Sequence, residues 1–416
     1  MNPFKESVKS LTIKPFLIHL SSRFIITIAY QMQAVAISWW IYEITKNALY
    51  LGLIGLTEAL PALSISLFAG HWADIGSRKK IILGGMMCIS ILNLVALLAS
   101  FYLDSSSYYL LPTLFGIIFF TGLARGIMGP SNFAFISQLV EKEYLPNAAT
   151  WNSFSWQFSM VLGPMLAAVF LGLAGNTSVQ IIISILSLLS VVLYWNVKAR
   201  FKQTFNTTTE SISLSLKAGI TYVFQHPILL GALTLDMFAV LFGGVTAILP
   251  AYTQEIFKAG PDVLGYLRSS PALGSIITML FLAGNPPIKN TGKILFISVF
   301  MFGVFTLLFA LTNHLFAACI FLFLTGAFDA ISVVIRGTIL QLYTPENMRG
   351  RVSSVNTIFI GSSNELGAFE SGLAAKIMGI IPSVLFGGCV TIFVVIASAL
   401  KFRELYRLNL LNDKGG

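Results

Sequence analysis

Charged residues are scarce in this chain. Asp, Glu, Lys and Arg make up 10% of its 416 residues, whereas hydrophobic residues make up 56%. A water-soluble domain of this length has to cover its surface with many more polar groups, so the composition excludes that class of protein. The mean hydropathy of +0.82 indicates instead a chain that lies mostly in lipid.

Cysteine and histidine are also rare. The three cysteines, Cys88, Cys319 and Cys389, fall within apolar runs, so we expect reduced thiols and no disulfide. The four histidines are scattered singly, and no HExxH, GxSxG or phosphate-loop motif is present. We therefore expect no metal site, no cofactor and no enzymatic activity.

Twelve apolar runs dominate the sequence, and each is long enough to cross a bilayer as a helix. The runs lack the alternation of barrel strands, and lipid does not tolerate open strand edges, so helices are predicted. The expected fold is an all-α membrane protein with twelve transmembrane helices. The spans are expected near residues 17–41, 49–70, 81–102, 108–137, 147–173, 178–197, 227–250, 263–284, 293–312, 315–341, 353–378 and 382–400.

Basic residues are distributed unevenly between the two sides of the expected membrane. If both termini lie inside, three of the 26 lysines and arginines fall in outer loops, four lie in or beside spans, and the remaining 19 lie inside. This positive-inside pattern predicts cytoplasmic termini, and the net charge of +9 then reflects topology rather than a nucleic-acid surface. The outer three are Lys46, Lys258 and Lys376, and the four in or beside spans are Arg23, Arg125, Arg268 and Arg336.

The longest polar stretch, residues 198–217, separates six spans from six. Short matches link the halves: Pro61-Ala62-Leu63 recurs as Pro271-Ala272-Leu273, although chance matching of common membrane residues is an open alternative. The layout predicts two pseudo-symmetric six-helix bundles. The expected division is an N-terminal bundle at 1–197, a cytoplasmic linker at 198–222, a C-terminal bundle at 223–403 and a cytoplasmic tail at 404–416.

A short charged loop, GHWADIGSRKK at 70–80, connects the second and third spans. Further distinctive stretches are QMQ in span 1, LFGGVTAILP in span 7, PENMRGRV before span 11 and GSSNELGAFESG within it. In these stretches the chain resembles the major facilitator superfamily of transporters, and within it the bacterial branch that includes the enterobactin exporter and macrolide efflux proteins. The resemblance implies a multi-pass protein of the bacterial inner membrane.

The loop at 70–80 resembles the signature loop of that superfamily, which gates the transporter. Ile75 and Ser77 replace an arginine and a glycine of the family pattern, which implies a thinner charge network. A basic cluster before span 11 is the counterpart in the second half. The predicted gating residues are Gly70, Asp74, Arg78, Lys79, Arg349 and Arg351.

Ionisable residues inside spans each cost about 2.5–3.5 kcal/mol on insertion scales, so each needs a partner or a watery cavity. Arg125 is expected to pair with a carboxylate that protonates during transport, to hold an anionic substrate, or to form a permanent structural pair. Asp236 suits proton uptake because a lone carboxylate is costly to ionise in hydrocarbon; the alternative is permanent hydrogen bonding to a neighbouring helix. The candidates for proton coupling are Arg125, Asp236, Asp329, Glu58 and Glu365.

Asp329 and Arg336 share one helix face, but seven residues separate them by about 10 Å along the axis, too far for a direct pair. Arg336 is expected instead to extend to the inner membrane surface. Polar amides within spans are expected either to contact substrate or to bond neighbouring helices. The candidates for the substrate cavity are Gln31, Gln33, Asn152, Asn356 and Asn364.

The expected function is export of a small organic molecule, either a drug-like amphiphile or a siderophore, by alternating access in exchange for protons. The protein is expected to act as a monomer in the lipid bilayer, with no nucleic acid partner. An importer or lipid flippase on the same fold, and a membrane sensor that transports nothing, are the alternatives.

Overall fold

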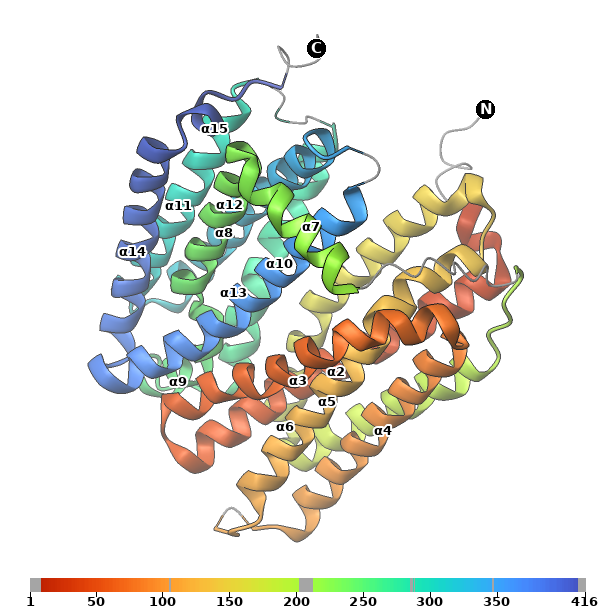
Figure 1. Ribbon diagram of the computed structural model, residues 1–416. Coiled ribbons are helices and arrows are strands. Elements are labelled where there is room, and N and C mark those ends of the chain that lie inside the picture. The colour runs from red at the N-terminus through yellow and green to blue at the C-terminus, as the bar shows by residue number, and fades with distance from the viewer. Residues whose placement is uncertain are drawn as a thin grey trace. The chain divides into compact units, whose positions relative to one another are not determined.

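The computed structural model describes residues 9–104, 106–201, 212–284, 287, 289–345 and 348–410. Within these residues every regular element is a helix (Figure 1). Nine helical stretches of this described part are long and apolar enough to span a membrane. One of them, Asn147–Trp195, has 49 residues, and a kink at Gly175 divides it into two spans.

Two further helices are long enough to cross a bilayer, α10 with 24 residues and α13 with 30. With them the twelve expected spans are present, which confirms the all-α membrane fold. Spans 5 and 6 are joined differently from the expectation, because Gly175 makes the turn between them within α6 with a φ of 75°. Glycine tolerates that angle, which other residues rarely adopt.

The chain forms two compact units. The first comprises residues 1–45 and 57–208, and the second comprises residues 46–56 and 209–416. The elements from the N-terminus to residue 201 are η1 (Lys9–Thr12), α2 (Lys14–Thr45), α3 (Ala48–Ile75), α4 (Arg78–Tyr102), α5 (Leu110–Phe135), η2 (Ile136–Gln138), η3 (Lys142–Tyr144) and α6 (Leu145–Trp195).

In the first unit, α2 packs along α6, and α4 packs against both α5 and α6. The core joins residues far apart in sequence: Phe16, Met86, Phe135 and Tyr194 are fully buried in one cluster. Large apolar side chains thus fill the contacts between helices, while many others face outward, as expected for a protein whose solvent is lipid.

The second unit is built from the remaining helices. Within it, α8 contacts α13 and α14, α10 packs against α12, and α11 lies between α12 and α14. Its elements after residue 211 are α7 (Ile212–Gln225), α8 (Pro227–Gly243), η4 (Val245–Ile248), α9 (Leu249–Glu255), α10 (Pro261–Gly284), α11 (Thr291–Leu311), α12 (Leu315–Leu342), α13 (Arg349–Met378), α14 (Ile380–Lys401) and α15 (Arg403–Arg407).

Span 7, expected as one helix over 227–250, is broken. α8 ends at Gly243, Gly244 has φ −72° and ψ 53°, and a 3-10 turn leads into α9. A break in lipid is tolerated only where the freed backbone groups find partners. Close to the break, the hydroxyl of Thr391 on α14 donates to the carbonyl oxygen of Ala239 at 3.3 Å.

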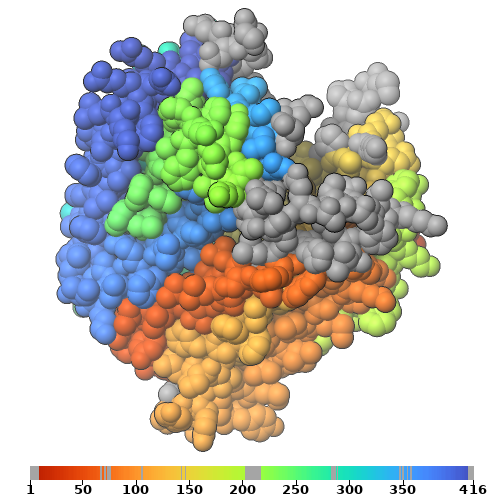
Figure 2. Space-filling view, in the orientation of Figure 1, coloured from red at the N-terminus to blue at the C-terminus, as the bar shows by residue number. Residues whose placement is uncertain are grey.

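The last part of the segment expected as a linker is helical, since α7 begins at Ile212. α7 packs against α13, and Figure 2 shows it in green on the surface of the second unit beside blue residues of α13. Gly219 permits this contact, because a Cβ at that position would lie 2.8 Å from the carbonyl oxygen of Arg351.

The backbone provides independent support for the repeat between the two halves. Lys46 follows the first span and Lys258 follows the seventh, and each has a positive φ, 47° and 50°. Non-glycine residues rarely adopt this conformation. The same unusual turn thus ends the first span of each half.

Helices α10 and α12 cross at backbone contact. A Cβ built on Gly326 of α12 would overlap the carbonyl oxygen of Pro271, and one built on Gly274 of α10 would overlap that of Phe323. Small residues at such crossings let helices approach closely in membranes, where packing rather than the hydrophobic effect holds them together.

We expect Gly326→Ala to lower the stability of the protein, because the new methyl group has to separate α12 from the backbone of α10. Overpacking of this kind costs roughly 1–3 kcal/mol. The matched control is Gly337→Ala on the same helix, where a Cβ would meet nothing within 4 Å. Because alanine favours a helix over glycine, the control should be neutral or stabilising. Thermal unfolding in detergent measures both, and equal effects of the two changes would contradict the packing.

Candidate functional site

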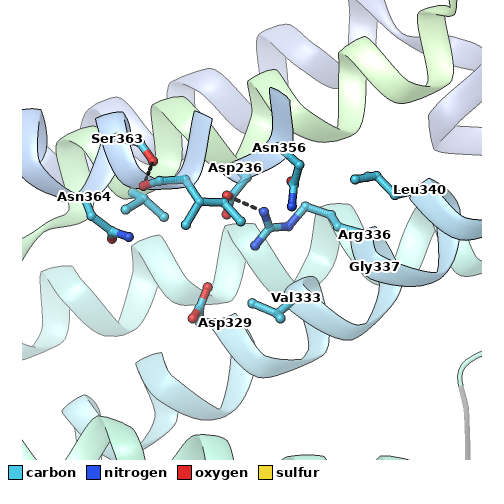
Figure 3. Close-up of a pocket in the computed structure, with 11 residues that line it drawn as sticks. Asp236, Asp329, Val333, Arg336, Gly337, Leu340, Asn356, Ser363 and Asn364 are labelled. Atoms are coloured by element: carbon cyan, nitrogen blue, oxygen red, sulfur yellow. Dashed lines mark hydrogen bonds and ion pairs between the residues drawn. The ribbon is translucent and has the colours of Figure 1, made fainter. Parts of the chain in front are cut away.

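A cavity of about 220 Å³, lined by both charged and apolar residues, lies in the second unit. It is formed by one face each of α8, α12 and α13, and two acids and an arginine are among its lining residues (Figure 3). Such a group of charges inside membrane-spanning helices marks a functional site by default. The lining residues are Asp236, Val240, Asp329, Val333, Arg336, Gly337, Leu340, Asn356, Ile360, Ser363 and Asn364.

Arg336 forms an ion pair with Asp236, whose side chain is 7% exposed while that of Arg336 is 6% exposed. The Nε of Arg336 also donates to the hydroxyl of Ser332, one turn earlier, at 3.2 Å. The expectation that Arg336 extends to the inner surface is therefore wrong. A partner 100 residues away in sequence holds it inside the protein, because a buried pair satisfies both charges.

Asp329 lies on the other side of the cavity from this pair, as Figure 3 shows. It is half-buried, and no hydrogen bond or ion pair to its carboxylate is made by the described residues. Asn356 and Asn364 also line the cavity, both from α13. The cavity therefore offers a carboxylate and two amides to an incoming molecule or to water.

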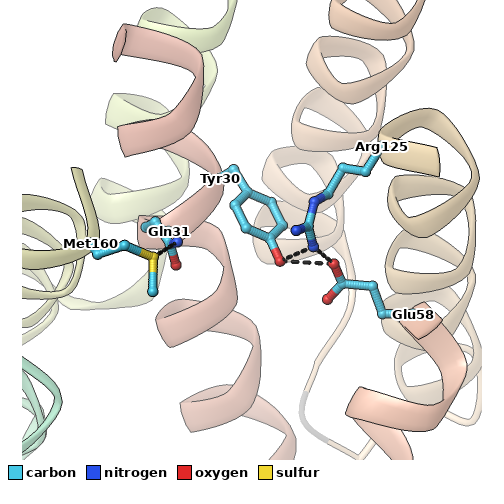
Figure 4. Close-up of polar contacts among 5 residues, drawn as sticks. All are labelled: Tyr30, Gln31, Glu58, Arg125 and Met160. Carbon is cyan, nitrogen blue, oxygen red and sulfur yellow. Dashed lines mark hydrogen bonds and ion pairs between the residues drawn. The ribbon is translucent and has the colours of Figure 1, made fainter. Parts of the chain in front are cut away.

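A second network of charges occupies the first unit (Figure 4). Arg125 on α5 forms an ion pair with Glu58 on α3, and its guanidinium donates a hydrogen bond to the hydroxyl oxygen of Tyr30 on α2. The same hydroxyl donates to Glu58 at 2.7 Å, and the guanidinium lies 4.2 Å from the centre of the Tyr30 ring. Arg125 is 36% exposed and Glu58 is 15% exposed, so water reaches this pair more easily than the pair in the second unit.

The local fold explains why Glu58 and Arg125 meet. A Cβ on Gly122 of α5 would overlap the carbonyl oxygen of Glu58, so the two backbones touch at this level. Arg125 is one turn further along α5, within reach of the carboxylate. Tyr30, which completes the network, was not among the sequence candidates; an interior tyrosine in a span is its only sequence signal.

The remaining cavity candidates have different surroundings. Gln31 is buried and its amide contacts the sulfur of Met160, and Gln33 is buried with no hydrogen-bond partner for its amide in the described part of the chain. Asn152 accepts a hydrogen bond from Arg23 at 2.6 Å. Glu365 on α13 lies beside Gly55, a residue that groups with the second unit.

Two of the predicted gating residues bond the ends of neighbouring helices. Arg78 donates to the carbonyl oxygen of Ala134 at 3.2 Å, and Lys79 donates to that of Trp195 at 2.8 Å. Cations are favourable at helix C-termini, so these contacts tie the start of α4 to the ends of α5 and α6. Arg351 contacts the sulfur of Met348. The side chains of Gly70, Asp74 and Arg349 lie outside the described residues.

Comparison with known proteins identifies the family. The model of a family described as transmembrane secretion effectors matches residues 10–411. The chain belongs to this family. Among curated relatives, it is 23% identical over 388 residues to the staphyloferrin A transporter of Staphylococcus aureus, covering 92% of this chain and 96% of the relative. It is 25% identical over 390 residues to the enterobactin exporter of Salmonella paratyphi A, covering 93% and 92%.

Solved structures share the fold of this secretion effector. A POT family transporter in complex with 5-aminolevulinic acid superposes with a TM-score of 0.74 at 13% identity, covering 94% of this chain and 96% of that one. A bacterial homologue of the iron transporter ferroportin, in an inward-facing state, gives 0.70 at 15% identity, covering 95% and 99%. The family match, rather than these distant structures, identifies the protein as a multi-pass membrane transporter of the major facilitator superfamily and not an enzyme.

The two ion pairs inside membrane-spanning helices, Glu58–Arg125 and Asp236–Arg336, should differ in their contribution to stability. We expect Asp236→Asn to be the more damaging carboxylate-to-amide change, because it leaves Arg336 charged and buried, which typically costs 3–5 kcal/mol. Glu58→Gln should cost less, because water screens the more exposed Arg125. The exposed Glu143→Gln is the matched control. Thermal unfolding of the purified variants measures the order.

A double variant tests whether the cost of Asp236→Asn arises from the unpaired arginine. Removing both charges in Asp236→Asn/Arg336→Gln should recover part of the lost stability, because contacting residues are not additive. A double variant as unstable as the sum of the two single changes would show that the pair is not coupled.

Proposed function

We propose that this transporter exports a small organic molecule across the bacterial inner membrane in exchange for protons. The observation that supports this most is the carboxylate of Asp329, which lines a cavity opposite the Asp236–Arg336 pair and forms no hydrogen bond or ion pair with the described residues. The family match already identifies the protein as a transporter. The direction of transport, its coupling to protons and the class of transported molecule are proposed here.

The chemistry of the cavity suits exchange. A proton on Asp329 and a hydrogen-bond donor or cationic group of the cargo compete for the same carboxylate, because a proton removes the negative charge that the cargo group binds. If the cargo binds from the cytoplasm and displaces the proton, and the opposite exchange occurs outside, then one proton enters for each molecule that leaves. Alternating access between the two faces of the membrane completes the cycle.

The class of cargo is proposed from the relatives. Two of them are named as a staphyloferrin A transporter and an enterobactin exporter, which favours a siderophore. A drug-like amphiphile is the second class, since amides and a carboxylate in a mostly apolar protein accommodate varied polar groups. We propose that the protein acts as a monomer with both termini in the cytoplasm.

We expect purified protein in proteoliposomes to expel protons from the cavity when cargo is added. The panel should contain enterobactin, staphyloferrin A and ethidium, and a pH-sensitive dye in weak buffer measures the release. Asp329→Asn should abolish both the release and accumulation driven by a proton gradient, but it should retain downhill exchange of labelled cargo. Asp104→Asn, the same change in an exposed loop, is the control. No pH change with a compound that is transported would reject the coupling.

The direction of transport is tested in a separate experiment. Accumulation in inside-out vesicles and not in right-side-out vesicles is expected for an exporter. The opposite result would favour an importer. If Asp329→Asn and Arg125→Ala leave every transport measurement unchanged, a sensor that transports nothing becomes the better explanation.

A further inference from the structure

Three polar side chains in the core of the first unit have no hydrogen-bond partner among the described residues. They are His19 of α2, at both ring nitrogens, and Ser190 and Tyr194 of α6, at their hydroxyls. All three residues are fully buried. Buried polar groups in folded proteins almost always have a partner, so three unsatisfied groups in one unit point to a bound ligand.

Contacts between α2 and α6 bring these groups together. The ring centres of His19 and Tyr194 lie 5.7 Å apart, and the hydroxyl of Ser22 on α2 donates to the carbonyl oxygen of Ser190 at 2.5 Å. His19 and Ser22 are one turn apart on α2, and Ser190 and Tyr194 are one turn apart on α6, so each pair shares a helix face. At the end of α5, the ring of Phe135 contacts both aromatic rings, with centres 5.6 Å and 6.4 Å away. The three unsatisfied groups therefore lie in one small region between the start of α2 and the end of α6.

A cation adjoins this region. Arg23 lies one turn after His19 on α2, on the same helix face. Arg23 interacts electrostatically with both His19 and Tyr194, and its guanidinium donates to the amide oxygen of Asn152 at 2.6 Å. A guanidinium has five N–H donors, and Arg23 forms no ion pair with a described residue. The region thus combines a positive charge with hydroxyl and ring N–H donors.

This set of donors matches a small anion. A serine or tyrosine hydroxyl donates one hydrogen bond, and a neutral histidine ring donates one from either nitrogen. An anion accepts all three and also offsets the charge of Arg23, whereas a buried cation without a negative partner is costly. The donors are fully buried, so the anion has to be small. A halide ion meets these requirements.

We propose that a chloride ion binds between His19, Ser190 and Tyr194, beside Arg23. The ion accepts hydrogen bonds from side chains of both helices, so it stabilises the contact between the start of α2 and the end of α6. None of these four residues lines the cavity of the second unit. The chloride site is therefore independent of the direction of transport, its coupling to protons and the class of cargo.

An ordered water molecule is the competing ligand, because buried waters commonly satisfy polar groups of this kind. Water can accept a hydrogen bond from Tyr194 and donate one to His19. It carries no charge, however, and leaves Arg23 without a negative partner. The two ligands differ in one property that can be measured, since chloride has to be supplied by the buffer.

Thermal unfolding of the full-length protein in detergent measures the dependence on chloride. Chloride is exchanged for gluconate at constant ionic strength, because gluconate has the same charge but is too large for a site among fully buried side chains. A ligand that binds only the folded state raises the Tm. We expect the Tm of the wild type to rise by a few degrees and to level off as chloride is added, and bromide should act in the same way. Equal Tm values in chloride and gluconate would assign the region to water and overturn the proposal.

Variants locate the effect on the protein. Tyr194→Phe keeps the ring but removes one donor, and Arg23→Gln removes the charge, so both should lose most of the rise in Tm that chloride causes. Tyr252→Phe is the matched control, because this fully buried tyrosine of the second unit already donates to the carbonyl oxygen of Ala310 at 3.0 Å. It should keep the wild-type rise even if its Tm in gluconate falls. An undiminished rise in either Tyr194→Phe or Arg23→Gln would place the chloride effect elsewhere and overturn the proposal.

Crystals grown in bromide give a direct test. Anomalous scattering from the bromide ion should produce a peak between the ring of His19 and the hydroxyl of Tyr194. Well-ordered helices α2 and α6 without a peak at this position would overturn the proposal. Neither measurement uses transport, so a failure of export or of proton coupling would leave the chloride site unaffected.

Discussion

A charge inside a membrane-spanning helix is the constraint on which this structure depends, because lipid offers it neither water nor counter-ions. The protein meets the constraint in two ways. In the second unit, Asp236 and Arg336 bury each other almost completely. In the first unit, Glu58 and Arg125 stay closer to water and add the Tyr30 hydroxyl and ring as a third partner. Water therefore reaches the second pair more easily than the first.

Backbone packing determines which charges can meet. Helices that cross at glycine come close enough for short acidic side chains to reach across, as Glu58 does beside Gly122. In the second unit, Asp236 lies on α8, eight residues before the break at Gly244. The helix that carries the buried acid therefore ends at this break and does not continue directly into α9.

The sequence predicts the spans well and the site only in part. Long apolar runs at 49–70 or 293–312 determine their own structure, because twenty apolar residues in lipid have no alternative to a helix. The break in span 7 was not predicted, since Gly243 and Gly244 lie in an apolar run and glycine is common in such helices. The importance of charged residues was visible, but their partners were not. Arg336 was assigned to the surface because its partner Asp236 lies far away in sequence, and only tertiary packing of α8 on α12 brings them together.

Arg23 shows the opposite case, in which a sequence candidate directed attention to its neighbour. Asn152 was expected to contact substrate, and the structure places it against a guanidinium that sequence reasoning had left at the edge of a span. Asp329 and Arg23, neither of which forms an ion pair with a described residue, have opposite signs and lie in different units. A carrier has to bind its cargo and also release it. A charge that is fully paired within the protein has no free interaction to offer to cargo. A deeply buried charge without a partner would destabilise the folded protein too much. A half-buried charge that is hydrogen-bonded to a neutral amide, or that faces a cavity, avoids both problems. A ligand or a proton can bind to such a charge and leave again.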